Sequence, residues 1–299
     1  TTFGVSLLNY LINGSISKYG GWHAAFLDVD SSFIREQAVN DKLAATAVFD
    51  NIGYAGLDGG QNPDKPYLFI AGFTDETFAA LPITLLSGRL PENSGEILIS
   101  SKVASDGGVS FKVGDTLSLS VGNRMDGDRK LSQSDPYAAG RETFVPQAEK
   151  TYTVVGTCRR PDYEEASAPG YTLITKADDR TETDSFSLFV TLKNPRQVRA
   201  YVNSTGNHAY VLNDNVLRFM GISDDNLFNM FMYSMGGIVI AIIMLGSIFL
   251  IYNSFNMSLN ERKQQFGILS SVGATAKQLR NSVLFEGFCI GMIGIPIGI

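Results

Sequence analysis

The residue types that most often carry out chemistry in proteins are scarce in this sequence. His23 and His208 are the two histidines of the 299-residue chain, and Cys158 and Cys289 are its two cysteines. The histidines stand at the starts of two expected strands, but no cysteine or carboxylate cluster at metal-ligand spacing accompanies them, so we expect no metal site. The sequence contains neither a G-x-x-x-x-G-K-[ST] phosphate loop nor a G-x-S-x-G nucleophile elbow. We therefore expect no catalytic residues and no cofactor.

An uncharged stretch dominates the last quarter of the chain. No charged residue lies between Asp225 and Glu261, a run of 35 positions whose centre reads MGGIVIAIIMLGSIFLIY. About 20 apolar helical residues cross the hydrocarbon core of a bilayer. The stretch therefore predicts a membrane helix over residues 229–257. The alternative, a buried helix of a soluble core, seldom runs so long without a charge.

Apolar segments also lie at the two ends of the chain. SVLFEGFCIGMIGIPIGI is still uncharged after Glu286 when the sequence stops, which predicts the start of a further membrane helix over residues 281–299. TTFGVSLLNYLIN predicts the end of a preceding membrane helix over residues 1–16; the alternative is a short amphipathic helix of a soluble domain. Because Cys289 falls in a membrane segment and Cys158 outside it, we expect no disulfide between them.

Charge predicts the orientation of these segments. Residues 258–281 contain four basic residues and one acid, whereas the long sequence before them is rich in acids. Lys and Arg in short loops resist translocation, while large domains cross largely regardless of charge. We therefore expect residues 258–280 in the cytoplasm and residues 17–228 outside it. The lipid bilayer is an expected partner, and nucleic acid is not.

Residues 17–228 are long enough for a folded extracytoplasmic domain, and the two ends of this region look alike. WHAAFLDV, SSFIREQAVNDKL and TAVFDNIGYAGL predict a strand, a helix capped by Asp30, and a strand. SFSLFVTLK, NPRQVRAYVN and HAYVL repeat this pattern, with Asn194 and Pro195 at the helix start. Two βαβ units on one sheet predict a ferredoxin-like α+β fold. Between them, GEILIS, DTLSLSV and TYTVVGT predict a β-rich insertion, and residues 122–142 a mobile surface loop.

Small residues recur at a spacing of four in the membrane segments, which lets helix backbones approach closely. These candidate packing residues are Gly237, Ala241, Gly287, Gly291, Gly294 and Gly298. Glu286 lies inside the last segment, where an acid is costly unless it reaches the interface or a partner. Of these two interpretations we favour reach to the interface over a helix contact.

The segment NERKQQFGILSSVGATAKQL follows the long uncharged stretch. Residues 259–271 predict a continuation of the membrane helix that turns Phe266 and Leu269 to one side. Gly273 suits the C′ position that ends a helix, and Thr275 with Gln278 is a capping box that opens the next one. An amphipathic helix on anionic lipid would use the same residue types. The fixed reversal favours docking of the apolar residues on a protein.

This segment resembles the one that follows the second membrane helix in FtsX/MacB-type ABC transporter permeases. The matching residues are Glu261, Arg262, Phe266, Gly267, Ile268, Leu269, Gly273, Ala274, Thr275, Gln278 and Glu286. SGRLPENSGEILIS, FKVGDTLSLSV and YTVVGT resemble extracytoplasmic patterns of the same family. This sequence departs from the family in its length, because such permeases have at least four membrane helices.

The resemblance implies a permease subunit without its own nucleotide site. Its partners would be a cytoplasmic ABC ATPase and a second permease copy or half. The ATPase would dock on the matching residues from Glu261 to Gln278. ATP-driven motion would pass through the membrane helices to the outer domain, for export or envelope remodelling. A membrane-bound sensor is the alternative function, but its second helix should lead to a cytoplasmic signalling helix. A membrane-anchored enzyme would need a catalytic cluster.

Overall fold

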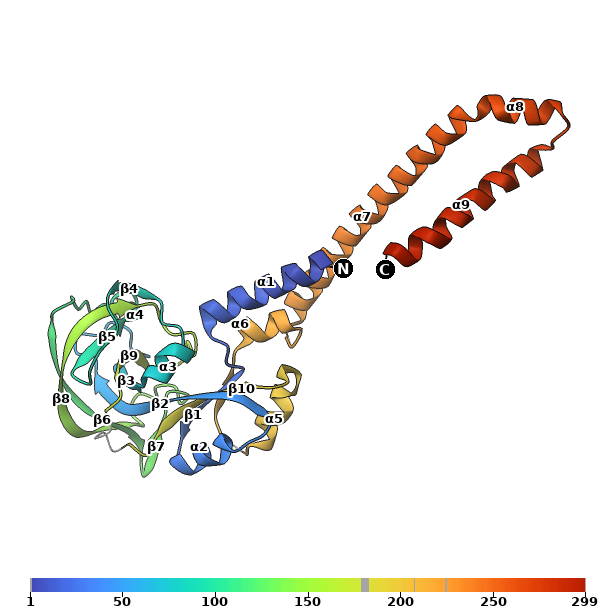
Figure 1. Cartoon of the computed structure of the whole chain (residues 1–299). Coiled ribbons are helices and arrows are strands. Elements are labelled where there is room, and N and C mark those ends of the chain that lie inside the picture. Colours follow the sequence, from blue (N-terminus) through green and yellow to red (C-terminus); the bar gives the residue numbers. More distant parts are fainter. Residues whose placement is uncertain (1, 179–182, 207, 224, 299) are drawn as a thin grey trace. The chain divides into compact units, whose positions relative to one another are not determined.

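The computed structural model describes residues 2–178, 183–206, 208–223 and 225–298 (Figure 1). The chain divides into two compact units, Thr1–Asp224 and Asp225–Ile299. The first unit is a mixed α/β domain built on an 11-stranded sheet, and the second unit consists of helices.

One end of the sheet is built from the two predicted strand–helix–strand units. They comprise β1 (Ala24–Val29), α2 (Ser31–Ala38) and β2 (Leu43–Gly56), then β10 (Phe186–Leu192), η1 (Pro195–Gln197), α5 (Val198–Ser204) and β11 (Tyr210–Leu212). The strand order is β11-β1-β10-β2, and each neighbouring pair is antiparallel. The two units thus share one sheet in a ferredoxin-like arrangement, as the sequence predicts.

The helices of these units begin at the predicted caps. The Asp30 carboxylate accepts the N–H of Phe33 at 2.8 Å, which satisfies one of the free donors of the first turn of α2. The Asn194 side chain accepts the N–H of Arg196 at 3.1 Å, and Pro195 occupies the first helical position. The second helix starts as a 3₁₀ turn before it continues as α5.

The remaining strands extend the same sheet and curl it. They are β3 (Tyr67–Phe73), β4 (Leu85–Gly88), β5 (Glu96–Ser100), β6 (Thr116–Asp126), β7 (Arg129–Leu131), β8 (Thr143–Cys158) and β9 (Gly170–Lys176), with the short helices α3 (Asp75–Ala80) and α4 (Lys102–Ser105). From β2 the order continues β3-β9-β5-β8-β6-β7, while β4 pairs with β8. β6 also returns to β2, where Tyr54 pairs with Gly122. Gly53 lies beside this pairing with φ +141°, and a Cβ there would approach the Gly122 carbonyl oxygen to 2.8 Å. Only glycine fits so close a crossing.

The central strands β3 and β9 have no counterpart in the sequence prediction. They run parallel to each other, and every residue of β3 is buried. A strand that is buried on both faces shows no alternation of apolar and polar residues, so the two-residue period that identifies a half-exposed strand is missing. The β-rich insertion lies between the two units in sequence, as predicted, and its strands join the same sheet.

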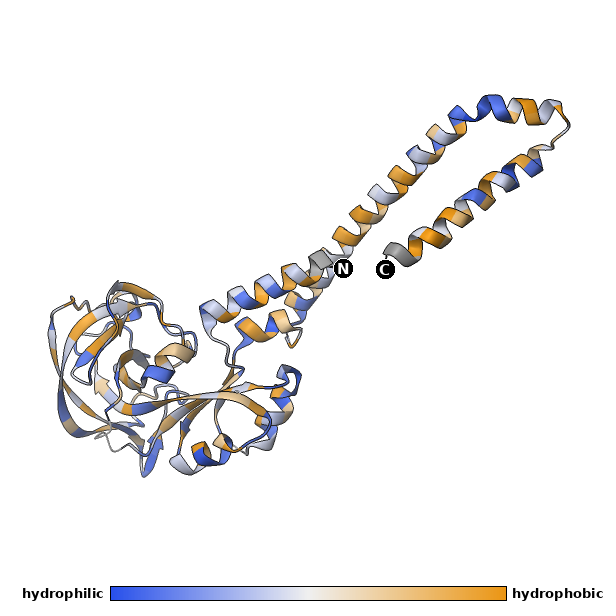
Figure 2. Ribbon diagram, in the orientation of Figure 1, coloured by the Kyte–Doolittle hydropathy of each residue, from blue (hydrophilic) through white to orange (hydrophobic). Residues whose placement is uncertain are grey.

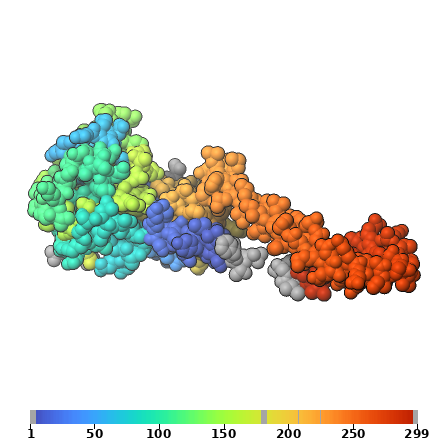
Figure 3. All heavy atoms as spheres, turned by 90° about the horizontal axis from the view of Figure 1, so that it is seen from above, coloured from blue at the N-terminus to red at the C-terminus, as the bar shows by residue number. Residues whose placement is uncertain are grey.

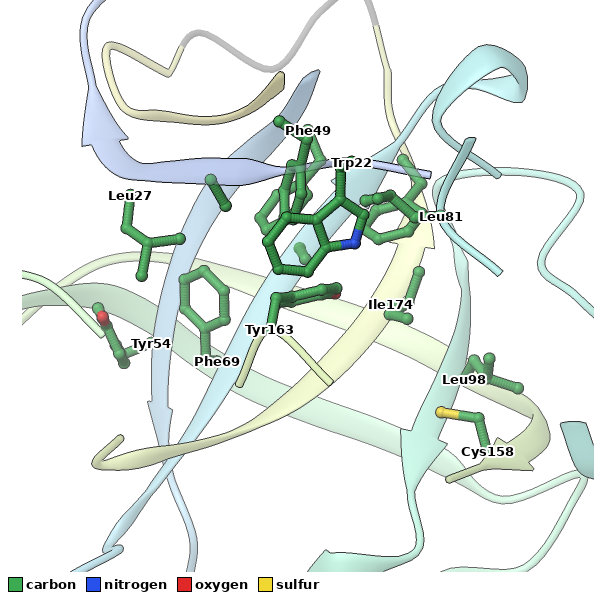
Figure 4. Close-up of a cluster of buried hydrophobic side chains, with 14 of the residues drawn as sticks. Trp22, Leu27, Phe49, Tyr54, Phe69, Leu81, Leu98, Cys158, Tyr163 and Ile174 are labelled. Carbon is green, nitrogen blue, oxygen red and sulfur yellow. The ribbon is translucent and has the colours of Figure 1, made fainter. Parts of the chain in front are cut away.

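Three apolar clusters stabilise the sheet among the described residues. Figure 4 shows the first, in which Trp22, Phe49 and Tyr163 lie together. The ring of Phe189 packs edge-on against Trp22, with centroids 5.2 Å apart. The second cluster draws its residues mainly from strands β2, β3, β5, β6, β8 and β9, and the third lies between the sheet and helices α2 and α5.

The prediction of a mobile loop over residues 122–142 is wrong. Most of the first half of this segment forms strands, and hydrogen bonds and an ion pair anchor the second half to the domain. β6 continues to Asp126 and forms a hairpin with β7. Arg124 is buried and donates to the carbonyl oxygens of Ser132 and Asp135 at 2.8 and 3.2 Å, and its guanidinium pairs with Glu142. The charged residues of this segment suggested that it is exposed, but the opposite charges of Arg124 and Glu142 neutralise each other inside the fold.

Three helices flank this domain at its ends in sequence. α1 (Thr2–Tyr19) covers residues 2–16 of the predicted helix and continues to Tyr19, whereas residue 1 lies outside the described residues. The place of this helix in a membrane stays a prediction. α1 packs on α6 (Asp214–Leu217) and η2 (Arg218–Met220), which follow the last strand (Figures 1 and 3). The indole N–H of Trp22 donates to the Tyr19 carbonyl at 2.9 Å and fixes the end of α1 to the sheet.

The second unit contains α7 (Asn226–Glu261), α8 (Lys263–Ser271) and α9 (Ala276–Gly298). Figure 1 shows α7 and α9 as antiparallel arms that α8 and a short turn connect.

Candidate functional site

Helix α7 has the length and composition of a membrane span. Asp225 caps it, because its carboxylate accepts the N–H groups of Leu227 and Phe228 at 3.0 and 3.1 Å. Its 36 residues extend about 54 Å at roughly 1.5 Å per residue, more than the roughly 30 Å of a hydrocarbon core. Figure 2 shows that α7 is hydrophobic along most of its length, and its large apolar side chains are exposed. Within the described ranges, α7 is the one helix that passes this test of length and apolarity.

The helix does not continue unbroken to residue 271, which corrects the sequence prediction. α7 ends at Glu261, and α8 begins at Lys263. Arg262 between them has φ −90° and ψ 0°, outside the regular helical values. The break falls at the residue whose side chain contacts α9.

The end of α8 is the predicted glycine cap. Gly273 has φ +100°, and its N–H donates to the Ser270 carbonyl at 3.1 Å. The N–H of Ala274 donates to the Leu269 carbonyl at 3.0 Å. These two bonds form a Schellman motif, which satisfies the last carbonyl groups of α8 and reverses the chain.

The start of α9 is the predicted capping box. The N–H of Thr275 donates to the side-chain oxygen of Gln278 at 2.9 Å, and the N–H of Gln278 donates to the Thr275 hydroxyl at 3.4 Å. Reciprocal bonds of this kind fix where a helix begins. The reversal between α8 and α9 is therefore specified on both sides by local hydrogen bonds.

An exposed apolar face lies on α8. Ile268 and Leu269 are 60% and 49% exposed, and Val272 is 83% exposed. Phe266 is half-buried and lies three residues before Leu269, a spacing that places it beside Leu269 at the edge of this group. Sequence reasoning did not include Val272, although its spacing of four from Ile268 and three from Leu269 is the helical signal for a shared face. We call Ile268, Leu269 and Val272 the α8 apolar face.

Glu286 makes a helix contact, the interpretation that sequence reasoning disfavoured, and the reach of its carboxylate to the membrane interface stays a prediction. The Arg262 Nη1 donates to Glu286 Oε2 at 2.7 Å, and these form an ion pair. The two residues are 24 positions apart, at the end of α7 and within α9. The sequence contained both charges but no signal for their pairing.

The small residues of the membrane segments differ in their surroundings. A Cβ at Gly287 would lie 3.4 Å from the ring of Phe255, so α9 approaches α7 closely there. Around Gly237, Gly291 and Gly294, the described residues leave open space at the Cβ position, and Ala241 is exposed. Gly298 lies at the end of α9, outside the residues whose surroundings are described. Helix packing at these other positions stays a prediction.

The histidines and cysteines of the first unit have structural contacts. His23 is buried, its Nδ1 accepts the N–H of Leu192 at 3.0 Å, and burial lowers the pKa of His23. The ring of His208 packs on Phe33, with centroids 4.4 Å apart. Burial raises the pKa of the Cys158 thiol to about 12. Among the described residues, no group of three or more His, Cys, Asp or Glu side chains could hold a metal.

Solved structures similar to this chain are domains of transporters and of a permease protein. The extracellular domain of the noncanonic ABC-type transporter YknZ from Gram-positive bacteria has 11% identity and TM-score 0.32, covering 64% of this chain and 98% of that one. The periplasmic region of MacB from Actinobacillus actinomycetemcomitans has 10% identity and TM-score 0.34, covering 71% and 98%. A domain of a putative permease protein from Porphyromonas gingivalis has 10% identity and TM-score 0.32, covering 67% and 97%. These scores are low, and the fold assignment rests on the strand pairing described above.

The helical unit gives a family match. Curated proteins gave no match to the chain. The family model described as FtsX-like permease C-terminal matches residues 237–299, which include most of α7 and all of α8. Residues 237–299 are therefore similar to FtsX-like permeases, which confirms the resemblance that the segment after the long helix shows.

Proposed function

We propose that this chain is the permease subunit of an FtsX/MacB-type ABC transporter. Residues 229–257 cross the membrane, residues 258–280 lie in the cytoplasm, and residues 17–228 form the extracytoplasmic domain. Residues 1–16 and 281–299 are parts of the neighbouring membrane helices. The family match over residues 237–299 and the apolar surface of α7 support this placement, and the positive charge of the reversal supports its orientation.

The observation that carries the proposal is the construction of the reversal. A helix that lies on lipid has no need of a glycine cap and a capping box at fixed places, whereas a docking element must present its apolar residues in one geometry. In this chain the two caps hold the α8 apolar face, Ile268, Leu269 and Val272, at the end of a helical hairpin. The occupant is the cytoplasmic ABC ATPase, which contacts the interface residues Glu261, Arg262, Phe266, Gly267, Ile268, Leu269, Gly273, Ala274, Thr275 and Gln278.

The direction of α9 separates this function from a sensor. In a receptor, the helix that leaves the membrane leads to a cytoplasmic signalling element. In this chain, the helix after the reversal is apolar from Gly287 onward. ATP hydrolysis belongs to the partner, and the helices transmit its motion to the outer domain. A second permease copy or half completes the transporter.

Co-purification tests the function. The full-length protein is expressed with the ABC ATPase encoded in a neighbouring reading frame and is purified through a tag on the permease. We expect the ATPase to be retained and to hydrolyse ATP faster than it does alone. An ATPase that is neither retained nor stimulated contradicts the proposed function.

A further inference from the structure

The contact between α7 and α9 is concentrated at one level of the hairpin. The Arg262 guanidinium binds the Glu286 carboxylate at 2.7 Å, and one residue further along α9 the Phe255 ring lies over Gly287. No other ion pair joins the described parts of α7 and α9. A groove runs between the two helices beside these contacts, and its lining residues include Ile251, Ser254, Phe255, Glu286, Gly287 and Ile290. The ion pair and the Phe255–Gly287 contact together are called the α7–α9 clamp.

The position of Glu286 explains why it needs a partner. It is the last charged residue of the chain, and the rest of α9 is apolar. In water, an ion pair with side chains 44% and 40% exposed contributes little. At the edge of an apolar phase, a carboxylate without a partner is costly, and acids within membrane segments are satisfied by pairing. Arg262, at the point where α7 ends, supplies the partner.

The clamp also determines what α8 can move. α8 and the capped turn lie between Arg262 and Glu286 in sequence, so the clamp closes the base of the loop that contains them. A displacement of α8 then acts on α7 and α9 as one body. Without the clamp, α7 and α9 would be joined mainly through the turn, and α8 could rotate without moving them.

We propose that Arg262 and Glu286 are positioning residues that lock α7 to α9 so that motion of α8 is transmitted to both helices. The lock itself requires only the membrane placement of α7 and α9; its role in transmission rests on the proposed function.

Distance measurements on the full-length protein in lipid nanodiscs, without the ATPase, test the lock. Spin labels are attached at Cys289 in α9 and at Ser247→Cys in α7, with Cys158→Ala to remove the buried thiol. We expect Glu286→Gln and Arg262→Gln each to broaden the distance distribution, and the exchanged pair Arg262→Glu with Glu286→Arg to restore the parent width. Arg280→Gln is the matched control: it removes one arginine from the same helical hairpin and should leave the distribution unchanged.

Each result decides the proposal. A distance distribution in Glu286→Gln that is as narrow as in the parent protein overturns the lock. A distribution in the exchanged pair that is broader than in the single variants also overturns it. If the single variants aggregate because the ion pair is lost, an exchanged-pair variant that stays monodisperse and shows the parent distance supports the lock. An exchanged-pair variant that aggregates overturns it.

A second readout concerns transmission. With the ATPase present, Glu286→Gln should retain the ATPase on the permease but lose most of the stimulation of ATP hydrolysis, whereas Arg280→Gln should keep both. Retained stimulation with a broadened distribution would overturn the transmission role. Failure of the parent protein to bind any ABC ATPase would contradict the proposed function and leave the distance result unaffected.

Discussion

Arg124 and Glu142 form an ion pair inside the first unit, with side chains 0% and 1% exposed. The pair is bidentate, because Nη2 and Nε of Arg124 donate to the two carboxylate oxygens at 2.6 and 3.0 Å. The guanidinium also lies over the rings of Tyr54 and Tyr67, 5.3 and 5.5 Å from their centroids. This contact fastens the segment after β7 to the aromatic core.

The buried pair predicts a large loss of stability in Glu142→Gln. The substitution leaves the Arg124 charge buried without its counter-charge, which typically costs about 3–5 kcal/mol. Asp126→Asn is the control, because it breaks an exposed pair with Arg141 that is worth about 0–1 kcal/mol. Urea unfolding can be followed through Trp22, the single tryptophan, which is buried. Equal midpoints for the two variants would show that the buried pair does not anchor the segment.

Arg89 and Glu96 predict a pH dependence of stability. Two hydrogen bonds from the Arg89 guanidinium, at 2.7 and 2.6 Å, and one from the Glu92 N–H, at 2.9 Å, lower the pKa of Glu96 to about 2. Its unfolded pKa is about 4.3. A carboxyl with a lowered folded pKa stabilises the fold above the unfolded pKa, and this contribution is lost as the pH falls towards the folded pKa.

We therefore expect the free energy of unfolding to fall between about pH 5 and pH 2, and to fall less steeply in Glu96→Gln than in the parent. Denaturant unfolding of both proteins across this range measures the difference. Parallel curves would mean that the Arg89–Glu96 contact does not persist in solution.

Local signals in the sequence were sufficient to predict the reversal between α8 and α9. Gly273, Thr275 and Gln278 act on backbone groups within a few residues, so their spacing alone identifies the motif. The same holds for Asp30 at the start of α2. The two βαβ units were also predictable, because their strands alternate and their helices are capped.

Contacts between distant residues could not be predicted in this way. The Arg262–Glu286 and Arg124–Glu142 pairs join positions 24 and 18 apart, and charge in a sequence does not indicate which opposite charge is near in space. The wrong loop prediction and the disfavoured helix contact share this cause. The apolar strands β3 and β9 were missed for a different reason, the loss of alternation in strands buried on both faces.

The membrane orientation predicts which cysteines an impermeant thiol reagent can reach in whole cells. Asp128 is exposed at the β6–β7 turn, and Lys277 is exposed at the start of α9. In a protein with Cys158→Ala, we expect Asp128→Cys to be labelled in intact cells and Lys277→Cys to be labelled only after permeabilisation. The opposite pattern would reverse the topology and remove the permease function.

The α8 apolar face predicts how strongly a single charge should weaken ATPase binding. Leu269→Asp places a carboxylate beside Ile268 and Val272, and disruption of an interface anchor typically costs about 2 kcal/mol or more. At about 1.4 kcal/mol per decade, this corresponds to roughly thirtyfold weaker association. Ser270→Asp introduces the same charge on the opposite side of α8, because successive helical residues are about 100° apart, and should have little effect.

The measurement is co-purification of the ATPase with the full-length permease, together with permease-stimulated ATP hydrolysis, for both variants and for Lys277→Ala. Lys277 is exposed, and removal of an exposed charge should change binding much less than Leu269→Asp does. Equal losses of ATPase binding in Leu269→Asp and Ser270→Asp would indicate that added negative charge weakens binding wherever it is placed on α8. Retention of the ATPase by Leu269→Asp with release by Lys277→Ala would identify the segment as an electrostatic element, and docking through the α8 apolar face would be wrong.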